Sequence, residues 1–221
     1  MYLILLFVLA VLPSCLIAIF LYHQDKHEKE EHRHLWGAFG WGCLTILPAL
    51  WVEKWLMTIA DTPLYHAFVV AALTEEFFKF IFLYFLIFPR KYFNEPYDGI
   101  IYAAFISLGF ATIENLFYVY EGGIGVAILR MFMTVPGHAT WGIFMGYFIG
   151  IAKFHPTNKL PYLLAGLGVA VVAHGSYDYF LFEKAYDFLI FLSILLIIVS
   201  IFASRRAIRI HQERSPFKPE G

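Results

Sequence analysis

Charged residues are scarce in this sequence. Of its 221 residues only 15% are Asp, Glu, Lys or Arg, whereas a soluble domain carries about 25%. The formal net charge is −1, so no basic excess indicates a nucleic-acid partner. Cysteine is rare too, and Cys15 and Cys43 both lie in apolar stretches, which favours packing roles over a disulfide or a metal pair. With a hydrophobic content of 60%, these shortages exclude a soluble domain and indicate a multi-span membrane protein.

The apolar start of the chain, residues 2–22, lacks the positively charged flank and small-residue cleavage site of a signal peptide. It is long enough to cross about 30 Å of hydrocarbon, so it is predicted to be the first of about seven membrane spans. The others are predicted at residues 35–57, 62–88, 98–120, 126–152, 160–182 and 186–204, with chain breakers between them. The expected fold class is therefore all-α: one polytopic transmembrane helix bundle over residues 1–221.

Lys and Arg are divided unequally between the two sets of loops. One set, together with the C-terminal tail, carries twelve of the 16, and the opposite set carries only Lys54 and Lys184. Because cytoplasmic loops are enriched in Lys and Arg, we expect the amino terminus outside and the carboxyl terminus in the cytoplasm. The basic tail would touch anionic lipid of the bilayer. The polar segment 23–34 is expected to be a solvated cytoplasmic loop rather than a metal-binding tract.

A few ionisable residues lie inside the predicted spans, where each needs a partner or a task. They occur mainly in four motifs, which contain Glu75, Glu76 and Lys79 (TEEFFK), Glu114 and Asn115 (GFATIEN), His138 (VPGHATWG), and His174 and Asp178 (AHGSYD). The helical rise of 1.5 Å per residue puts all four motifs in the middle and outer half of the bilayer. One shared pocket is the economical explanation.

Helical spacing predicts which of these side chains face one another. His174 and Asp178 are four residues apart, so Asp178 can orient the imidazole by accepting a hydrogen bond. Glu75 and Lys79 are also four residues apart, whereas Glu76 points about 100° away from Glu75. We therefore expect Lys79 to pair with Glu75 and to leave Glu76 free for chemistry.

Each of these polar groups also has a purely structural explanation. Glu114 and Asn115 could lock neighbouring spans together by hydrogen bonding. Arg130 is expected to snorkel to the interface or to pair with Glu121 or Asp178. The joint occurrence of the four motifs favours a functional site over separate structural contacts.

Carboxylates and histidines in a wet pocket can activate water for hydrolysis. Glu75 or Glu76 would be the general base, with Glu76 slightly favoured, while His138 and His174 would stabilise an oxyanion or donate a proton. Zinc is possible, with Glu76, His138 and His174 as ligands, but the H-E-x-x-H signature is absent, and a metal-free glutamate mechanism fits at least as well. No serine lies in a G-x-S-x-G context and no aspartate pair lies in the spans, which argues against serine and aspartyl proteases.

Two other function classes use similar residues. A proton-coupled transporter would need a relay of Asp, Glu and His, but we find no inverted repeat with paired broken helices. A non-catalytic membrane or haem-binding protein would use His138 and His174 as axial ligands. Flux into proteoliposomes would identify the transporter, and a Soret band would identify the haem protein.

Taken in order, the four motifs resemble the PrsW family of intramembrane proteases over roughly residues 72–178, including the stretch EPYDGIIYAAFISLGFATIENLFY. The chain is more distantly similar to type II CAAX prenyl endopeptidases, which commonly have His where this sequence has Glu114. The PrsW resemblance implies a plasma-membrane protease with its catalytic helices at about 62–182. Such a protease makes the first, extracytoplasmic cut in a membrane-anchored anti-sigma factor during a stress response. The residues that the resemblance marks as catalytic are Glu75, Glu76, His138 and His174, with Lys79, Glu114, Asn115 and Asp178 expected in support.

Overall fold

The computed structural model describes residues 1–183 and 185–219, and within these residues every regular element is a helix. Lys184, counted above in an outer loop, lies outside the described residues. Five stretches are long and apolar enough to cross a membrane: α1 (Tyr2–Gln24), α2 (His32–Leu56), α5 (Pro96–Phe132) continuing into α6 (Thr134–Phe154), α7 (Leu160–Phe182) and α8 (Phe188–Glu213). The all-α prediction is confirmed. Helix α8 continues past residue 204, the predicted end of the last span.

The predicted span 62–88 corresponds to one rod made of four helical pieces: α3 (Pro63–Tyr65), η1 (His66–Leu73), α4 (Thr74–Phe82) and η2 (Leu83–Ile87), in which η denotes π-helical turns. The residues that join the pieces keep right-handed helical dihedral angles. Thr62 caps the rod because its side-chain oxygen accepts a hydrogen bond of 3.2 Å from the backbone N–H of Tyr65. The wide turns of η1 lead directly into Glu75, and such turns are frequent at functional sites.

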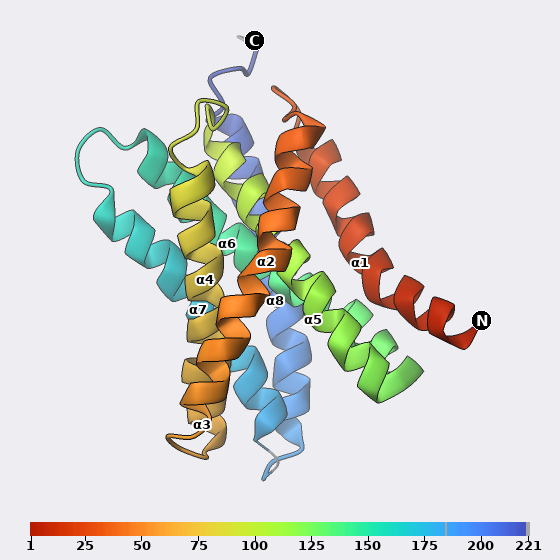
Figure 1. Ribbon diagram of the computed structural model, residues 1–221. Coiled ribbons are helices and arrows are strands. Elements are labelled where there is room, and N and C mark those ends of the chain that lie inside the picture. Colours follow the sequence, from red (N-terminus) through yellow and green to blue (C-terminus); the bar gives the residue numbers. More distant parts are fainter. Residues whose placement is uncertain (184, 220–221) are drawn as a thin grey trace.

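Helix α5 is the centre of the bundle and packs against α6, α2 and α1 (Figure 1). Every residue from Tyr97 to Thr112 is buried. Glycines allow backbones to touch at these contacts: a Cβ added to Gly99 would lie 2.4 Å from the carbonyl oxygen of Gly146, and one added to Gly42 would lie 2.0 Å from that of Ile106. Small residues at helix contacts of this kind bring polar groups on neighbouring helices within reach of one another.

A kink at Gly123 divides α5 into two arms. Gly123 has φ 69° and ψ −159°, a conformation that favours glycine because it has no Cβ. Residues 124–132 form the second arm, which ends at Met133 before α6 begins. The predicted span 126–152 is divided at Met133. Pro136 lies in the first turn of α6, where its missing N–H breaks no helical hydrogen bond.

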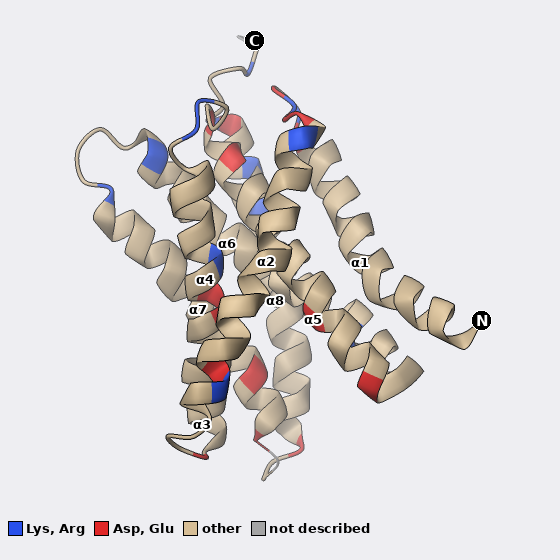
Figure 2. Ribbon diagram, in the orientation of Figure 1, with Lys and Arg blue, Asp and Glu red and all other residues tan. Residues whose placement is uncertain are grey.

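The loops gather at two ends of the bundle. Loops 25–31, 88–95 and 155–159 lie at the same end as the C-terminal segment, and the turn between α2 and α3 lies at the other end (Figure 1). Figure 2 shows that Lys and Arg concentrate at the first end, together with a group of Asp and Glu. Between the two ends, a smaller group of charged residues lies on the α4 rod and its neighbours.

Candidate active site

Side chains from α4, α6 and α7 meet inside the bundle. One ligand atom from each of Glu75, Glu76, His138 and His174 lies within 4.8 Å of the other three, and all four residues are buried. Helix α4 supplies the two carboxylates, α6 supplies His138 and α7 supplies His174. Together with Lys79, these residues form what we call the central cluster. The structure thus brings together residues up to 99 positions apart in the sequence.

Lys79 lies between both carboxylates. Its Nζ is 3.1 Å from Glu75 Oε2 and 2.8 Å from Glu76 Oε1. The expected pairing with Glu75 alone is wrong, because on a helix positions i+3 and i+4 are both within reach of a long side chain. The ammonium also lies 3.2 Å from His138 Nδ1 and 4.1 Å from the centre of the Phe110 ring. Lys79 therefore compensates two buried negative charges, and Glu76 is not left free.

His174 lies between two carboxylates. Its Nδ1 is 3.0 Å from Glu76 Oε1 and its Nε2 is 3.2 Å from Asp178 Oδ2, so Asp178 can orient the ring as predicted. Donation to both acceptors requires a proton on each ring nitrogen, which makes this residue an imidazolium. The ring stacks on Trp141, with 4.0 Å between ring centres. Glu76 is fully buried, and its Oε2 has no hydrogen-bond partner among the described residues.

Small residues next to the site let α7 approach the rod. A Cβ added to Gly175 would lie 2.4 Å from Cδ1 of Phe68, a residue of η1. Glycine at this position therefore lets α7 lie against η1 and brings His174 within hydrogen-bond distance of Glu76.

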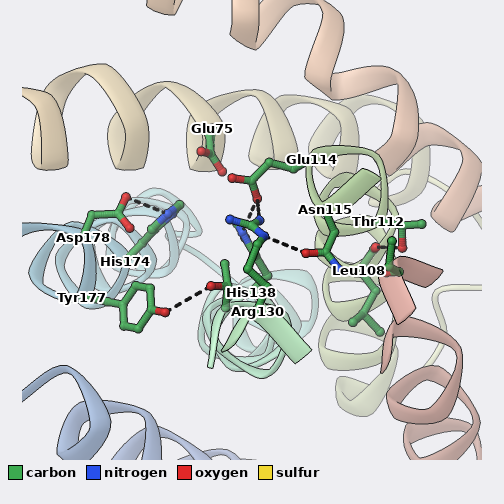
Figure 3. A network of polar contacts seen from close by, with 12 residues as sticks. Glu75, Leu108, Thr112, Glu114, Asn115, Arg130, His138, His174, Tyr177 and Asp178 are labelled. Carbon is green, nitrogen blue, oxygen red and sulfur yellow. Dashed lines mark hydrogen bonds and ion pairs between the residues drawn. The ribbon is translucent and has the colours of Figure 1, made fainter. Parts of the chain in front are cut away.

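His138 connects the central cluster to α5. Its Nε2 is 2.9 Å from Glu114 Oε2, while its Nδ1 faces the ammonium of Lys79. An ammonium can only donate, so Nδ1 must be the acceptor and Nε2 must carry the proton that Glu114 accepts. We assign His138 as the neutral Nε2–H tautomer on this hydrogen-bond pattern. Figure 3 shows Glu75 and Glu114 facing the same region from different helices.

Arg130 binds Glu114 and Asn115 instead of the expected Glu121 or Asp178. One guanidinium nitrogen is 2.8 Å from Glu114 Oε2, and Nε donates a 2.6 Å hydrogen bond to Asn115 Oδ1 (Figure 3). The kink at Gly123 returns the second arm of α5 toward the first and so makes this contact possible. Asn115 in turn donates to the carbonyl oxygen of Ala10, which joins α5 to α1.

A cavity of about 430 Å³ leads from the surface to this site. Its lining includes the exposed Asp61, Glu53 of α2, Glu114 and Glu75. Glu76, His138 and His174 are not among the lining residues. Of the two adjacent carboxylates, Glu75 is therefore the one that a substrate or water in the cavity can reach.

The motifs did not single out two residues that belong to this environment. Glu53 lines the cavity. Because it is an ionisable residue inside the predicted span 35–57, its position in the sequence could have marked it as a candidate site residue. Trp141 lies inside VPGHATWG and stacks on His174, but no sequence pattern distinguished it from an ordinary core residue.

The donor set fits a zinc ion. Two imidazoles and two carboxylates converge within 4.8 Å, and the unpartnered Oε2 of Glu76 is a free donor. Two groups conflict with a metal ion. The ammonium of Lys79 lies within 3.2 Å of three of these side chains, and the imidazolium of His174 would have to lose a proton before it could be a ligand. Two cations repel at such distances, so metal binding requires that the ammonium turns away. Glu76, His138 and His174 would then be ligands.

Comparison with known proteins identifies the family to which the chain is similar. Residues 30–204 match the family described as PrsW family intramembrane metalloprotease. The protein named Protease PrsW from Geobacillus kaustophilus is 36% identical over 176 residues, which cover 79% of this chain and 78% of the relative. The proteins of that name from Oceanobacillus iheyensis (33% identity; 89% of this chain and 93% of the relative) and Bacillus subtilis (30%; 77% and 80%) are similar as well.

No solved structure matches the chain. The family match decides between the protease and the alternative transporter and haem-protein functions. The predicted resemblance is confirmed over a longer stretch than the motifs cover. This chain is a multi-pass membrane peptidase and belongs to the PrsW family of intramembrane proteases.

Proposed function

We propose that Glu75 is the general base of this peptidase and that the cavity is where water and the substrate's peptide bond meet. One observation carries the proposal: of the two adjacent carboxylates, only Glu75 lines the cavity. Its Oε2 is bound by Lys79, which leaves Oε1 for a water molecule. This choice differs from the weak sequence-based preference for Glu76, which is fully buried and already bound to Lys79 and His174.

The proposed reaction needs no covalent intermediate. The oxygen of water attacks the carbonyl carbon of the peptide bond while Glu75 takes the proton. The negative charge that develops on the carbonyl oxygen is stabilised by the nearby positive charges of Lys79 and His174. The C–N bond then breaks, and the proton passes from Glu75 to the leaving nitrogen.

The supporting residues hold these groups in place. Asp178 and Glu76 keep His174 charged and oriented, and Glu114 holds the neutral His138 with its Nδ1 toward Lys79. When bound, a zinc ion would lower the pKa of a coordinated water and polarise the carbonyl group. Glu75, which lines the cavity, would be the general base with or without the ion.

We further infer seven membrane crossings, with the amino terminus outside and the carboxyl terminus in the cytoplasm of a bacterial cell. The concentration of Lys and Arg at one end of the bundle supports this orientation. The exposed Asp61, at the mouth of the cavity, lies in the turn at the opposite end and would face outward. An extracytoplasmic first cut in a membrane-anchored anti-sigma factor, as the family resemblance implies, fits this geometry.

The test is cleavage in proteoliposomes with purified protein and a membrane-anchored anti-sigma factor from the same bacterium. We expect one cut on the extracytoplasmic side in the wild type and none above background in Glu75→Gln. Glu121→Gln, an exposed glutamate on α5, is the matched control. Full cleavage by a folded Glu75→Gln protein would refute the assignment. Metal analysis of the active preparation, combined with chelator treatment, separates zinc-dependent from metal-free catalysis.

A further inference from the structure

A second group of buried carboxylates lies at the first turn of α5, apart from the central cluster. One oxygen from each of Glu28, Glu30 and Asp98 lies within 4.8 Å of the other two. Asp98 is fully buried and Glu30 is 4% exposed. Asp25, which is 1% exposed, adjoins them through a hydrogen bond from the backbone N–H of Glu30. We call these four residues the acidic cluster.

The acidic cluster corrects an expectation from the sequence. Segment 23–34 was expected to be a solvated loop, but Asp25 and Glu30 are buried because the loop folds onto the start of α5. A hydrogen bond from the Tyr102 hydroxyl to Glu30 Oε2 fixes this contact. Tyr97, one turn earlier, donates a 2.9 Å hydrogen bond to the carbonyl oxygen of Leu21.

Each of these carboxylates has one oxygen without a partner. Asp98 accepts hydrogen bonds of 2.7 Å and 2.8 Å from the N–H groups of Asn94 and Glu95 through Oδ2, which caps α5 and leaves Oδ1 unpaired. Glu30 and Asp25 show the same pattern, since Tyr102 and a backbone N–H occupy only one oxygen each.

Glu28 completes the set with a buried Oε2 that also lacks a partner. An unpaired buried oxygen on all four carboxylates needs an explanation, and binding of a cation accounts for all of them.

Positive side chains do not compensate this charge. Within residues 1–183 and 185–219, no Lys or Arg forms an ion pair with the acidic cluster. The closest basic group is His34, whose Nδ1 is 3.9 Å from Glu30 Oε2 and would supply one charge at most.

We propose that the acidic cluster binds a divalent cation with a preference for hard oxygen ligands, Mg²⁺ or Ca²⁺, through Glu28, Glu30 and Asp98. Carboxylate oxygens are the ligands that both ions take, and water would complete the coordination shell. The ion would tie the loop between α1 and α2 to the first turn of α5. The C-terminal segment docks at the same place, through hydrogen bonds from Ser215 to Glu95 and between His211 and the carbonyl oxygen of Pro96.

The experiment uses the full chain in detergent micelles, stripped with a chelator and then freed of it. Tb³⁺ is the probe, because it takes oxygen ligands and its luminescence is sensitised by a nearby tyrosine such as Tyr102. We expect saturable luminescence that Mg²⁺ or Ca²⁺ displaces, and the more effective competitor identifies the preferred ion. Glu76→Gln should leave this signal intact, which separates it from binding at the central cluster.

Two further variants should weaken cation binding without unfolding the protein. Glu28→Gln removes an oxygen that forms no hydrogen bond, so the fold should survive, and Glu30→Gln removes a second ligand. Each should weaken Tb³⁺ binding at least about tenfold, because even groups that only support a metal ligand contribute about 10–100-fold to affinity. Glu31→Gln, an exposed neighbour, is the matched control. Unchanged affinity in the first two variants, or no displacement by millimolar Mg²⁺ or Ca²⁺, would overturn the proposal and indicate carboxylates neutralised by protons.

Discussion

The central cluster and the acidic cluster both bury several carboxylates, and α5 contributes to each environment through Glu114 and Asp98. Sixteen residues separate these two, which is about 24 Å along a helix. Around Glu114, each of Glu75, Glu76, Glu114 and Asp178 has a positive side chain beside it, supplied by Lys79, Arg130 or His174. Around Asp98 the partners are a tyrosine hydroxyl and backbone N–H groups, which carry no net charge.

This difference shows two ways of keeping carboxylates away from water. In and beside the central cluster, the cations Lys79, Arg130 and His174 from three helices compensate the negative charge of the carboxylates without a ligand. In the acidic cluster, hydrogen bonds reach one oxygen each of Asp25, Glu30 and Asp98, and their donors bring no positive charge. Burying a charge without a partner is unfavourable, so the second arrangement depends on something from solution.

The largest expected effect is on the cleavage rate, and it distinguishes the roles of the two adjacent glutamates of the central cluster. Glu75→Gln should reduce the cleavage rate by about 10²–10⁴-fold, the usual contribution of a general base, with little change in stability. Glu76→Gln should lower both activity and stability, because it leaves the charges of Lys79 and His174 without their shared partner. Cleavage kinetics and thermal unfolding in detergent measure the two effects. A stable, inactive Glu76→Gln beside an active Glu75→Gln would reverse the assignment.

The next effect concerns the charge compensation itself. Lys79→Met should destabilise the protein by about 3–5 kcal/mol, because it leaves buried carboxylates uncompensated. Chemical denaturation in mixed micelles measures the change. Lys54→Met, at an exposed position near the end of α2, should be close to neutral. Equal stability of the two variants would mean that the central cluster does not depend on its lysine.

A smaller effect is expected at the edge of the central cluster. Arg130→Gln removes the contacts of the guanidinium with Glu114 and Asn115 and should cost about 1.5–3 kcal/mol, the range for hydrogen bonds to charged groups. Thermal unfolding checks this value. The second arm of α5, residues 124–132, should also be cleaved faster by added protease. A cleavage rate equal to that of the wild type would show that Gly123 alone maintains the bend.

The smallest effect tests the acidic cluster. A divalent cation at ten times its dissociation constant should stabilise the folded chain by roughly 1.4 kcal/mol. Thermal unfolding of chelator-stripped protein should shift upward with Mg²⁺ or Ca²⁺ in the wild type and in Glu31→Gln. The shift should be much smaller in Glu28→Gln, because tenfold weaker binding leaves at most about 0.4 kcal/mol. If that variant responds like the wild type, the ion acts elsewhere, and the contrast between the two clusters disappears.

Local patterns in the sequence predicted much of the site. The i to i+4 spacing of His174 and Asp178 predicted their contact, and the spacing of Glu75 and Lys79 predicted one of the two ion pairs of the lysine. The partner of Arg130 could not be predicted this way, because it depends on where the arm after Gly123 returns to α5. Choosing between the two glutamates required the cavity, which several distant segments form together.

The sequence by itself determined the helical, membrane-embedded class, the approximate positions of the helices and the protease family. These follow from composition, apolar run length and motif order, which are properties of short stretches of chain. Only the tertiary structure decided that Lys79 meets His138, that Glu75 faces the cavity and that the 25–31 loop buries its carboxylates against α5. Such contacts depend on the rotation and depth at which helices pack, and close backbone approach at glycines sets both over long sequence separations.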